Sequence, residues 1–212
     1  MFGNKSKQDV NEWALEYLEQ KYGEKFEYAA PAGASYTGAR SFLATCESFG
    51  ERKVLVQVDN YKDENNRVIR DNYMAIKYEQ EVKDEFTQIA NEEFGDSKVF
   101  YAASGRVLAA ELSSNMSFED YLKCSDGLIS AIVSLPEKGY KGAEQFTALS
   151  DRISSRFGCD ELSILIIVVS NAEFEITDEE LLRNMFSLKS GVAHSRITRY
   201  NGEVKLNIFS EE

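Results

Sequence analysis

LSILIIVV, residues 162–169, is the stretch of sequence that decides the fold class. Every residue in it is apolar except Ser163, and most are β-branched. A membrane-spanning helix needs about 20 consecutive apolar residues, so this stretch is too short to cross a bilayer. A short β-branched run that is apolar at both sets of alternate positions is typical of a strand buried on both faces. We therefore predict that 162–169 forms a central strand of a sheet.

The segments before and after this strand alternate between strand and helix patterns. A strand is predicted over 128–135, and a helix over 141–157 that ends at Gly158, because glycine readily adopts the left-handed backbone of a helix end. Thr177, followed three residues later by Glu180, predicts a capping box that begins another helix. Its apolar positions are Leu181, Leu182, Met185 and Phe186. The C-terminal half is thus expected to be a mixed sheet with packed helices.

A β-hairpin is predicted at the C-terminus. The segments 192–199 and 203–209 flank Asn201-Gly202, a pair that favours the two-residue turn joining antiparallel strands. Apolar residues alternate with polar ones along the last segment, as they do in a strand with one buried face. Because a terminal strand is often left at the side of a sheet, we expect this hairpin to form a sheet edge.

The N-terminal half begins with an amphipathic helix over 10–22 that ends at Gly23. Its apolar stripe consists of Val10, Trp13, Ala14, Tyr17 and Leu18. We expect Trp13, Tyr17 and Leu18 to be core residues.

Strands follow this first helix. One is predicted over 25–30, and three more form an antiparallel meander: 42–46, 54–58 and a segment carrying Met74, Ile76 and Tyr78.

A second helix, ending at Phe94-Gly95, leads to a strand over 98–103, which Ser104-Gly105 can join to 106–112 in another hairpin. The fold class is therefore α+β. The polar residues 113–115 give the best boundary, between a helix-plus-meander subdomain over 1–113 and a mixed α/β subdomain over 114–212. One continuous domain is the alternative.

The composition narrows the classes of partner. The 212 residues carry a net charge of −12, and such a chain is repelled by phosphate backbones and anionic lipid, so neither nucleic-acid binding nor membrane insertion is expected. The N-terminus lacks the apolar stretch of a signal peptide, and the three cysteines are far apart, which favours free thiols in the cytoplasm. An exported domain whose leader has been removed is the alternative.

The residues that could support catalysis or hold a cofactor are few. Gly33 and Gly38 have the spacing of a phosphate-binding loop but lack the lysine that such a loop needs. The oxygen-bearing side chains of 59–71 lack the glycine bend and the bidentate glutamate of a calcium loop, and a solvated turn is favoured. Cys159 follows a predicted helix C-terminus, which disfavours a reactive thiolate paired with His194. We predict no catalytic residue, cofactor or metal, and the sequence favours a non-enzymatic role.

A basic segment contrasts with this acidic background. Between residues 181 and 210 five Lys or Arg residues accompany the single acid Glu203. Four residues of this segment are the predicted binding residues: Arg183, His194, Arg196 and Arg199. Arginine suits the recognition of carboxylates, so an acidic protein surface is the expected partner. The simpler alternative is that these residues balance the protein's own acids.

Two functional hypotheses follow. The first is a binding or assembly module without enzymatic activity, which acts through a sheet edge or face and specifically through the C-terminal hairpin. The second is a small-ligand binder or an enzyme, with carboxylate, tyrosine and arginine side chains in a cleft between the two halves.

Overall fold

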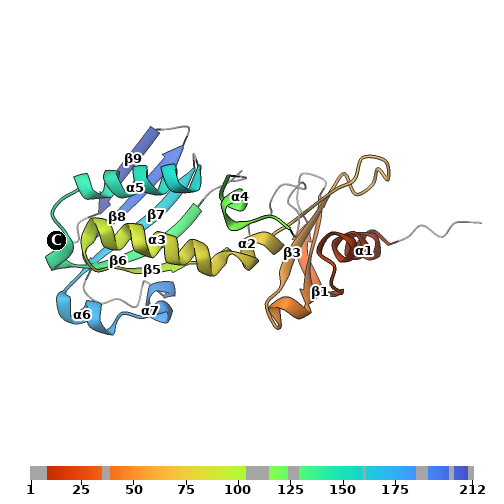
Figure 1. Ribbon diagram of the computed structural model, residues 1–212, viewed down its shortest axis with the longest axis horizontal. Coiled ribbons are helices and arrows are strands. Elements are labelled where there is room, and N and C mark those ends of the chain that lie inside the picture. The colour runs from red at the N-terminus through yellow and green to blue at the C-terminus, as the bar shows by residue number, and fades with distance from the viewer. Residues whose placement is uncertain are drawn as a thin grey trace, which may run out of the picture. The chain divides into compact units, whose positions relative to one another are not determined.

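The computed structural model describes residues 9–34, 39–103, 115–123, 129–159, 161–184, 191–200 and 203–209. The fold is α+β, as predicted, with one antiparallel and one mixed sheet (Figure 1). The chain divides into two compact units, Met1–Lys77 with Ala103–Ser117, and Tyr78–Ala102 with Phe118–Glu212. Residues 78–102 therefore belong with the C-terminal part of the chain, whereas the sequence grouped them with the first 113 residues.

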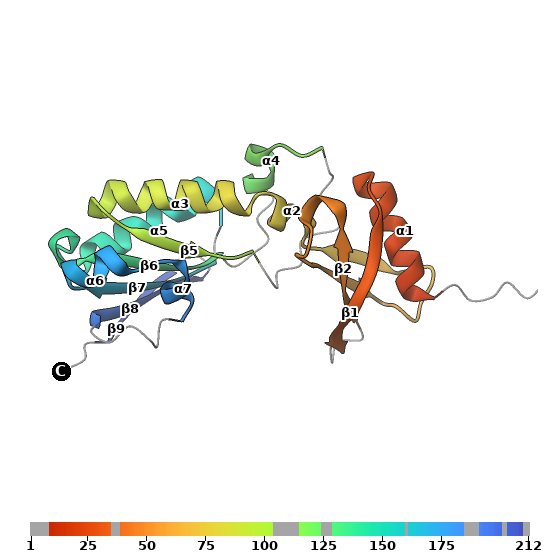
Figure 2. The same cartoon turned by 90° about the horizontal axis from the view of Figure 1, so that it is seen from below.

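The first unit is an antiparallel sheet of four strands in chain order, with helix α1 (Val10–Tyr22) packed against it (Figure 2). The strands are β1 (Phe26–Ala34), β2 (Arg40–Cys46), β3 (Val54–Asp59) and β4 (Val68–Asp71). A 3-10 turn, η1 (Glu47–Phe49), and helix α2 (Tyr73–Lys77) complete this unit. The meander of 42–46 and 54–58 is confirmed.

Helix α1 forms where it was predicted, but its buried stripe is narrower. The Asp9 carboxylate accepts a hydrogen bond from the Asn11 amide at the start of the helix, and Gly23 ends it with φ of 73°. The buried residues are Val10, Ala14 and Leu18. Trp13 and Tyr17 are half-buried, so their prediction as core residues was wrong. A 3.6-residue period selects a face of the helix but does not say how far the sheet reaches around it.

The predicted strand carrying Met74, Ile76 and Tyr78 is the main error in this half. Strand β4 ends at Asp71, and Met74 and Ile76 lie in helix α2. The Asp71 carboxylate accepts a hydrogen bond from the Tyr73 amide, which fixes the first helical turn. Residues 71–76 are all buried. The apolar residues at every second position of this segment therefore did not mark a buried strand face opposite an exposed one.

The second unit is a mixed sheet of five strands in the order β5-β6-β7-β8-β9. The strands are β5 (Lys98–Tyr101), β6 (Ile129–Pro136), β7 (Leu162–Val169), β8 (Gly191–Tyr200) and β9 (Glu203–Phe209). Strands β6 and β7 are parallel and the other neighbours are antiparallel. The central position of 162–169 and the C-terminal hairpin are confirmed, and β9 lies at the sheet edge. The hairpin predicted at Ser104-Gly105 and the turn Asn201-Gly202 lie outside the described residues.

Five helices and a 3-10 turn accompany this sheet in the described part of the unit. They are α3 (Glu79–Phe94), α4 (Phe118–Lys123), η2 (Glu137–Gly139), α5 (Glu144–Phe157), α6 (Asn171–Ile176) and α7 (Glu179–Arg183). Gly95 and Gly158 end α3 and α5 with positive φ, as predicted.

The helix boundaries after β7 differ from those predicted. Helix α6 was not predicted, and the Thr177 hydroxyl donates to the Glu173 carbonyl at the end of α6. The next helix, α7, is capped by Asp178, whose carboxylate accepts from the Leu181 amide, so the predicted capping box at Thr177 was wrong. Asp is as good an N-cap as Thr, and the sequence offered both residues side by side. Met185 and Phe186 lie outside the described residues.

Candidate functional site

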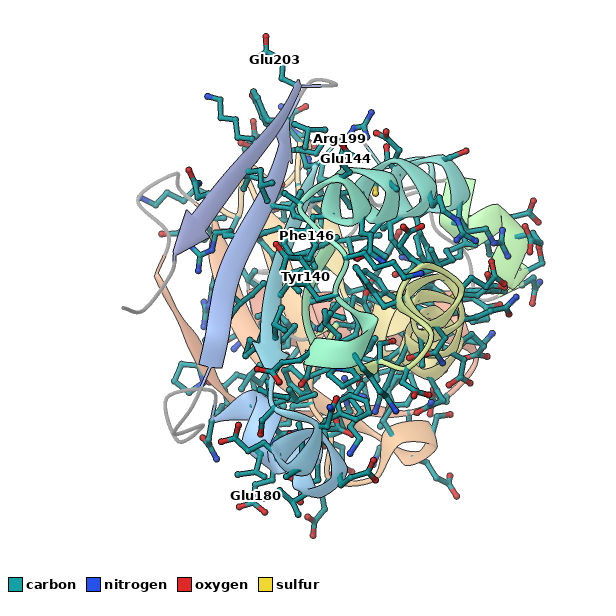
Figure 3. All side chains as sticks on the ribbon, turned by 90° about the vertical axis from the view of Figure 1, so that its left-hand side faces the viewer. Tyr140, Glu144, Phe146, Glu180, Arg199 and Glu203 are labelled. Atoms are coloured by element: carbon teal, nitrogen blue, oxygen red, sulfur yellow. The ribbon has the colours of Figure 1, made fainter. Side chains whose placement is uncertain are left out.

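The C-terminal sheet has two faces of different character. One face carries the long helices α3 and α5 (Figure 3). Ile164, Ile166 and Ile197 lie on this face, the face of Arg199, and are fully buried. On the other face Phe100, Ile132, Leu165, Arg196 and Asn207 form one row of register partners across the five strands. Helices α6 and α7 contact β5 and β6, and no helix among the described residues covers the second face of β8 and β9. On β7, Phe174 of α6 packs with the fully buried Ile167 and Val169. We call the rest of this second face, from Leu165 on β7 to β8 and β9, the open face.

Arg199 does not belong to the open face. Its Nη1 atom lies 2.7 Å from Oδ1 of Asp151 in α5, and its side chain is 18% exposed. Figure 3 shows Arg199 on the side of the sheet that carries the long helices. This arginine therefore balances one of the protein's own acids, which is the simpler alternative considered for the basic segment.

Arg196 lies on the open face and is exposed. Its register partners are Leu165 and Asn207, and Lys205 on β9 is its diagonal neighbour. Diagonal neighbours in an antiparallel pair lie about 7–8 Å apart, so one carboxylate can contact both cations. No Asp or Glu of the described residues lies within ion-pair distance of either. The open face thus holds two cationic side chains that none of these acids neutralises.

Arg183 lies over β5, at the opposite end of the register row from Arg196. It is the last residue of α7, and its guanidinium carbon lies 5.4 Å from the centre of the Phe100 ring. A guanidinium at this distance from an aromatic face makes a cation–π contact. The side chain is nonetheless exposed. We call Arg183, Arg196 and Lys205 the basic cluster.

Apolar and hydroxyl side chains accompany the basic cluster. Ile132 and Leu165 are half-buried and pack against Ile167, Val169 and Phe174. Tyr200, at the end of β8, is 62% exposed. Its partner in the register is Glu203, the acid that lies nearest in sequence to Lys205. The open face combines arginine, tyrosine and partly buried aliphatic residues, the types that are common at protein interfaces.

His194, the fourth predicted binding residue, lies in β8. Its register partners are Ile167 on β7 and Phe209 on β9. Lys205 and Tyr200 were not among the predicted site residues. The two-residue period of the predicted hairpin was the signal that could have added them, because it places 196, 198 and 200 on one face and 199 on the other.

Lys98 of β5 binds the C-terminal end of α6 beside the open face. Its ammonium donates to the backbone carbonyls of Phe174, Glu175 and Thr177. The carbonyls at the C-terminus of a helix lack hydrogen-bond donors within the helix and carry a partial negative charge. A lysine donates hydrogen bonds to them and also compensates that charge. Lys98 thus ties the end of α6, just before α7 begins, to β5.

A shallow groove of about 750 Å3 runs between α3 and α5 on the helix-covered side. Its charged residues form pairs: Arg156 with Glu85, Arg152 with Glu92, and Asp151 with Arg199. Hydrogen bonds from Arg156 hold the pKa of Glu85 below its usual value. Because these charges already neutralise one another, the groove is a weaker candidate than the open face.

The first unit contains a buried polar cluster at the junction of α1, β4 and α2. The Asp71 carboxylate is 3% exposed and accepts hydrogen bonds from Lys21 Nζ at 2.9 Å and the Tyr22 hydroxyl at 2.7 Å. The rings of Tyr22 and Tyr73 stack with centroids 3.9 Å apart. Burial, followed by the nearby Asp71 carboxylate, raises the pKa of Tyr22. Each group finds a partner within the cluster, which identifies it as a structural element of this unit.

A neighbouring group of polar residues shares Tyr73. Its hydroxyl lies 2.5 Å from Oε1 of Glu24, and burial raises the pKa of Tyr73 to about 12. Burial works to raise the pKa of Glu24, but hydrogen bonds from Tyr73 and Ser48 outweigh it and lower that pKa. Burial likewise raises the pKa of the Cys46 thiol to about 11, which makes this thiol a poor nucleophile at neutral pH.

The other sequence candidates do not converge on a site. Asp59 pairs with Arg70, and Asp63 accepts hydrogen bonds from Asn65 and Asn66 within its own turn. Among the described residues, no group of three or more His, Cys, Asp or Glu side chains is placed to hold a metal ion. Cys46 and Cys159 are buried and form no disulfide. No helix in the described part of the chain is both long and apolar enough to span a membrane.

Comparison with known proteins gives little further guidance. No family model matches the chain, and no curated protein matches it. Among solved structures, the chain is similar to a DUF5037 family protein from Ruminococcus gnavus ATCC 29149, with 16% identity over 94% of this chain and 95% of that chain. The TM-score of 0.45 is too low to support an argument about fold or function.

Proposed function

We propose that this chain is a non-enzymatic binding module whose contact surface is the open face of the C-terminal sheet, and that its partner is an acidic protein segment. The observation that carries the proposal is the basic cluster. In a chain of net charge −12, Arg183, Arg196 and Lys205 lie on one side of one sheet, and Arg196 and Lys205 have no ion-pair partner among the described acids.

Charge and surface chemistry both support an acidic protein as the partner. The chain as a whole has a net charge of −12 and repels such a segment, so attraction at the basic cluster gives specificity as well as a faster encounter. Ile132, Leu165 and Tyr200 add apolar area, which supplies the affinity that surface charges by themselves do not.

The test measures binding of two fluorescein-labelled peptides by anisotropy: one built of Glu, Leu and Ala, and one in which Lys replaces each Glu. We expect the acidic peptide to bind and the basic peptide not to bind. We also expect the affinity to fall between about 50 mM and about 300 mM salt, because exposed charges are screened over that range.

Two double variants separate the open face from overall charge. Arg196→Glu with Lys205→Glu should weaken binding of the acidic peptide at least about tenfold, because attraction becomes repulsion. Lys25→Glu with Lys62→Glu changes the net charge equally at exposed positions of the first unit and should change affinity less than about twofold. If both double variants lose affinity equally, or neither does, the open face is not the contact surface.

A further inference from the structure

The shape of the open face bears on the conformation of the partner, and this inference rests on the function proposed above. We infer that the partner segment binds as an amphipathic α-helix with acidic flanks, laid over β7 and β8 beside α7, with Arg183 at one flank and Arg196 at the other.

The first argument is the distance between the cations. Phe100, beneath Arg183, and Arg196 lie in the same register row three strands apart. Neighbouring strands are about 4.8 Å apart, so the two positions are separated by about 14 Å. Helix α7 lies over β5 and β6 in this interval, and a second helix packs beside it with its axis about 8–10 Å away, above β7 and β8.

The second argument is the chemistry of the surface between the cations. Ile132 and Leu165 occupy the two middle positions of the row and are half-buried. A helix with an apolar stripe about 100° wide places that stripe on these residues. Acidic residues on its two flanks then face Arg183 on one side and the pair Arg196 and Lys205 on the other.

The third argument is the layering of the fold. A sheet is normally covered on its apolar face by helices, and the first face of this sheet carries α3 and α5. On the second face α6 and α7 are short and contact β5 and β6 (Figure 3). A partner helix beside α7 continues that layer across β7 and β8.

Addition of a strand to the edge of β9 is the competing mode of recognition. It uses the backbone groups of the sheet edge and brings an acidic peptide near Lys205. It leaves Arg183 four strands away, without a contact to the partner. Dependence on Arg183 therefore discriminates between the two modes.

The experiment compares two peptides of about 18 residues and identical Leu, Glu and Ala composition. In one peptide leucine recurs at i, i+3, i+4 and i+7, and in the other it alternates with glutamate. We expect the first peptide to bind at least about tenfold more tightly and to gain helical circular dichroism on binding. Arg183→Glu and Arg196→Glu should each weaken it at least about fivefold. Lys141→Glu, the same change at an exposed position before α5, should not.

The outcomes separate the two proposals. If the alternating peptide binds more tightly and Arg196→Glu weakens it while Arg183→Glu does not, the helix is refuted and the binding function stands. If neither peptide responds to Arg196→Glu, both proposals fail. Should Arg183→Glu lower the thermal stability, Arg183→Gln, which keeps the side chain as far as Cδ and removes its charge, replaces it in the same measurement.

Discussion

Removal of the Asp71 carboxylate tests whether the buried cluster of the first unit stabilises it. Asp71 is 3% exposed and Lys21 is 10% exposed, and the pair is joined at 2.9 Å. Taking away one member of a buried pair leaves the other charge without its partner, at a cost of about 3–5 kcal/mol. Because a domain is stable by only about 5–15 kcal/mol, Asp71→Ala should bring this unit close to unfolding.

Urea unfolding followed by tryptophan fluorescence measures this loss. Trp13 is the single tryptophan, and it lies on α1 in the same unit, so its emission reports that unit. Asp59→Ala is the matched control, because Asp59 is 26% exposed and pairs with Arg70, which is 47% exposed. An exposed pair is worth about 0–1 kcal/mol, and the control should lose no more than that.

A milder variant keeps the test decisive if Asp71→Ala does not fold. Tyr22→Phe removes one hydrogen bond to the carboxylate, at 2.7 Å, and should cost about 1.5–3 kcal/mol. The reasoning is refuted if Asp71→Ala unfolds within 1 kcal/mol of Asp59→Ala, or if Tyr22→Phe is neutral within about 0.5 kcal/mol.

Three further predictions concern other parts of the chain. Trp13→Ala should lower the free energy of unfolding in urea by about 1–3 kcal/mol, because the ring is half-buried; circular dichroism follows the unfolding of this variant. A loss above about 4 kcal/mol would mean that Trp13 is a core residue. In native protein at pH 8, Cys46 and Cys159 should resist alkylation, because both thiols are buried and burial raises the pKa of Cys46 to about 11. After denaturation all three thiols should react, and a single reactive thiol would show a disulfide. Lys98→Met should increase amide exchange in α6, because three carbonyls at its C-terminal end lose their donor. Unchanged exchange would show that packing alone holds this helix.

Local signals in the sequence determined several elements correctly. Gly23, Gly95 and Gly158 end helices because glycine adopts positive φ without steric cost, and this depends on the residue itself. The run 162–169 forms the central strand because a segment that is apolar on both faces has to be covered on both. The two-residue period of the strand predicted over 192–199 puts Arg196 and Arg199 on opposite faces whatever the tertiary contacts are.

Other features depended on which residues the tertiary structure brings together. The strand predicted through Met74 is a helix, because the Asp71 and Asn72 side chains bind backbone amides and end β4. Trp13 follows the apolar period of its helix and is still half-buried, since the extent of the sheet decides its coverage.

The candidate site shows the same division. Its basic character was visible in the segment 181–210, but periodicity does not reveal which charges are neutralised within the fold. Arg199 meets Asp151, which is 48 positions away in sequence, whereas Arg183 meets the ring of Phe100. A charge is neutralised by whatever lies within a few ångströms of it, and only the packing of α5 and α7 on the sheet sets those distances.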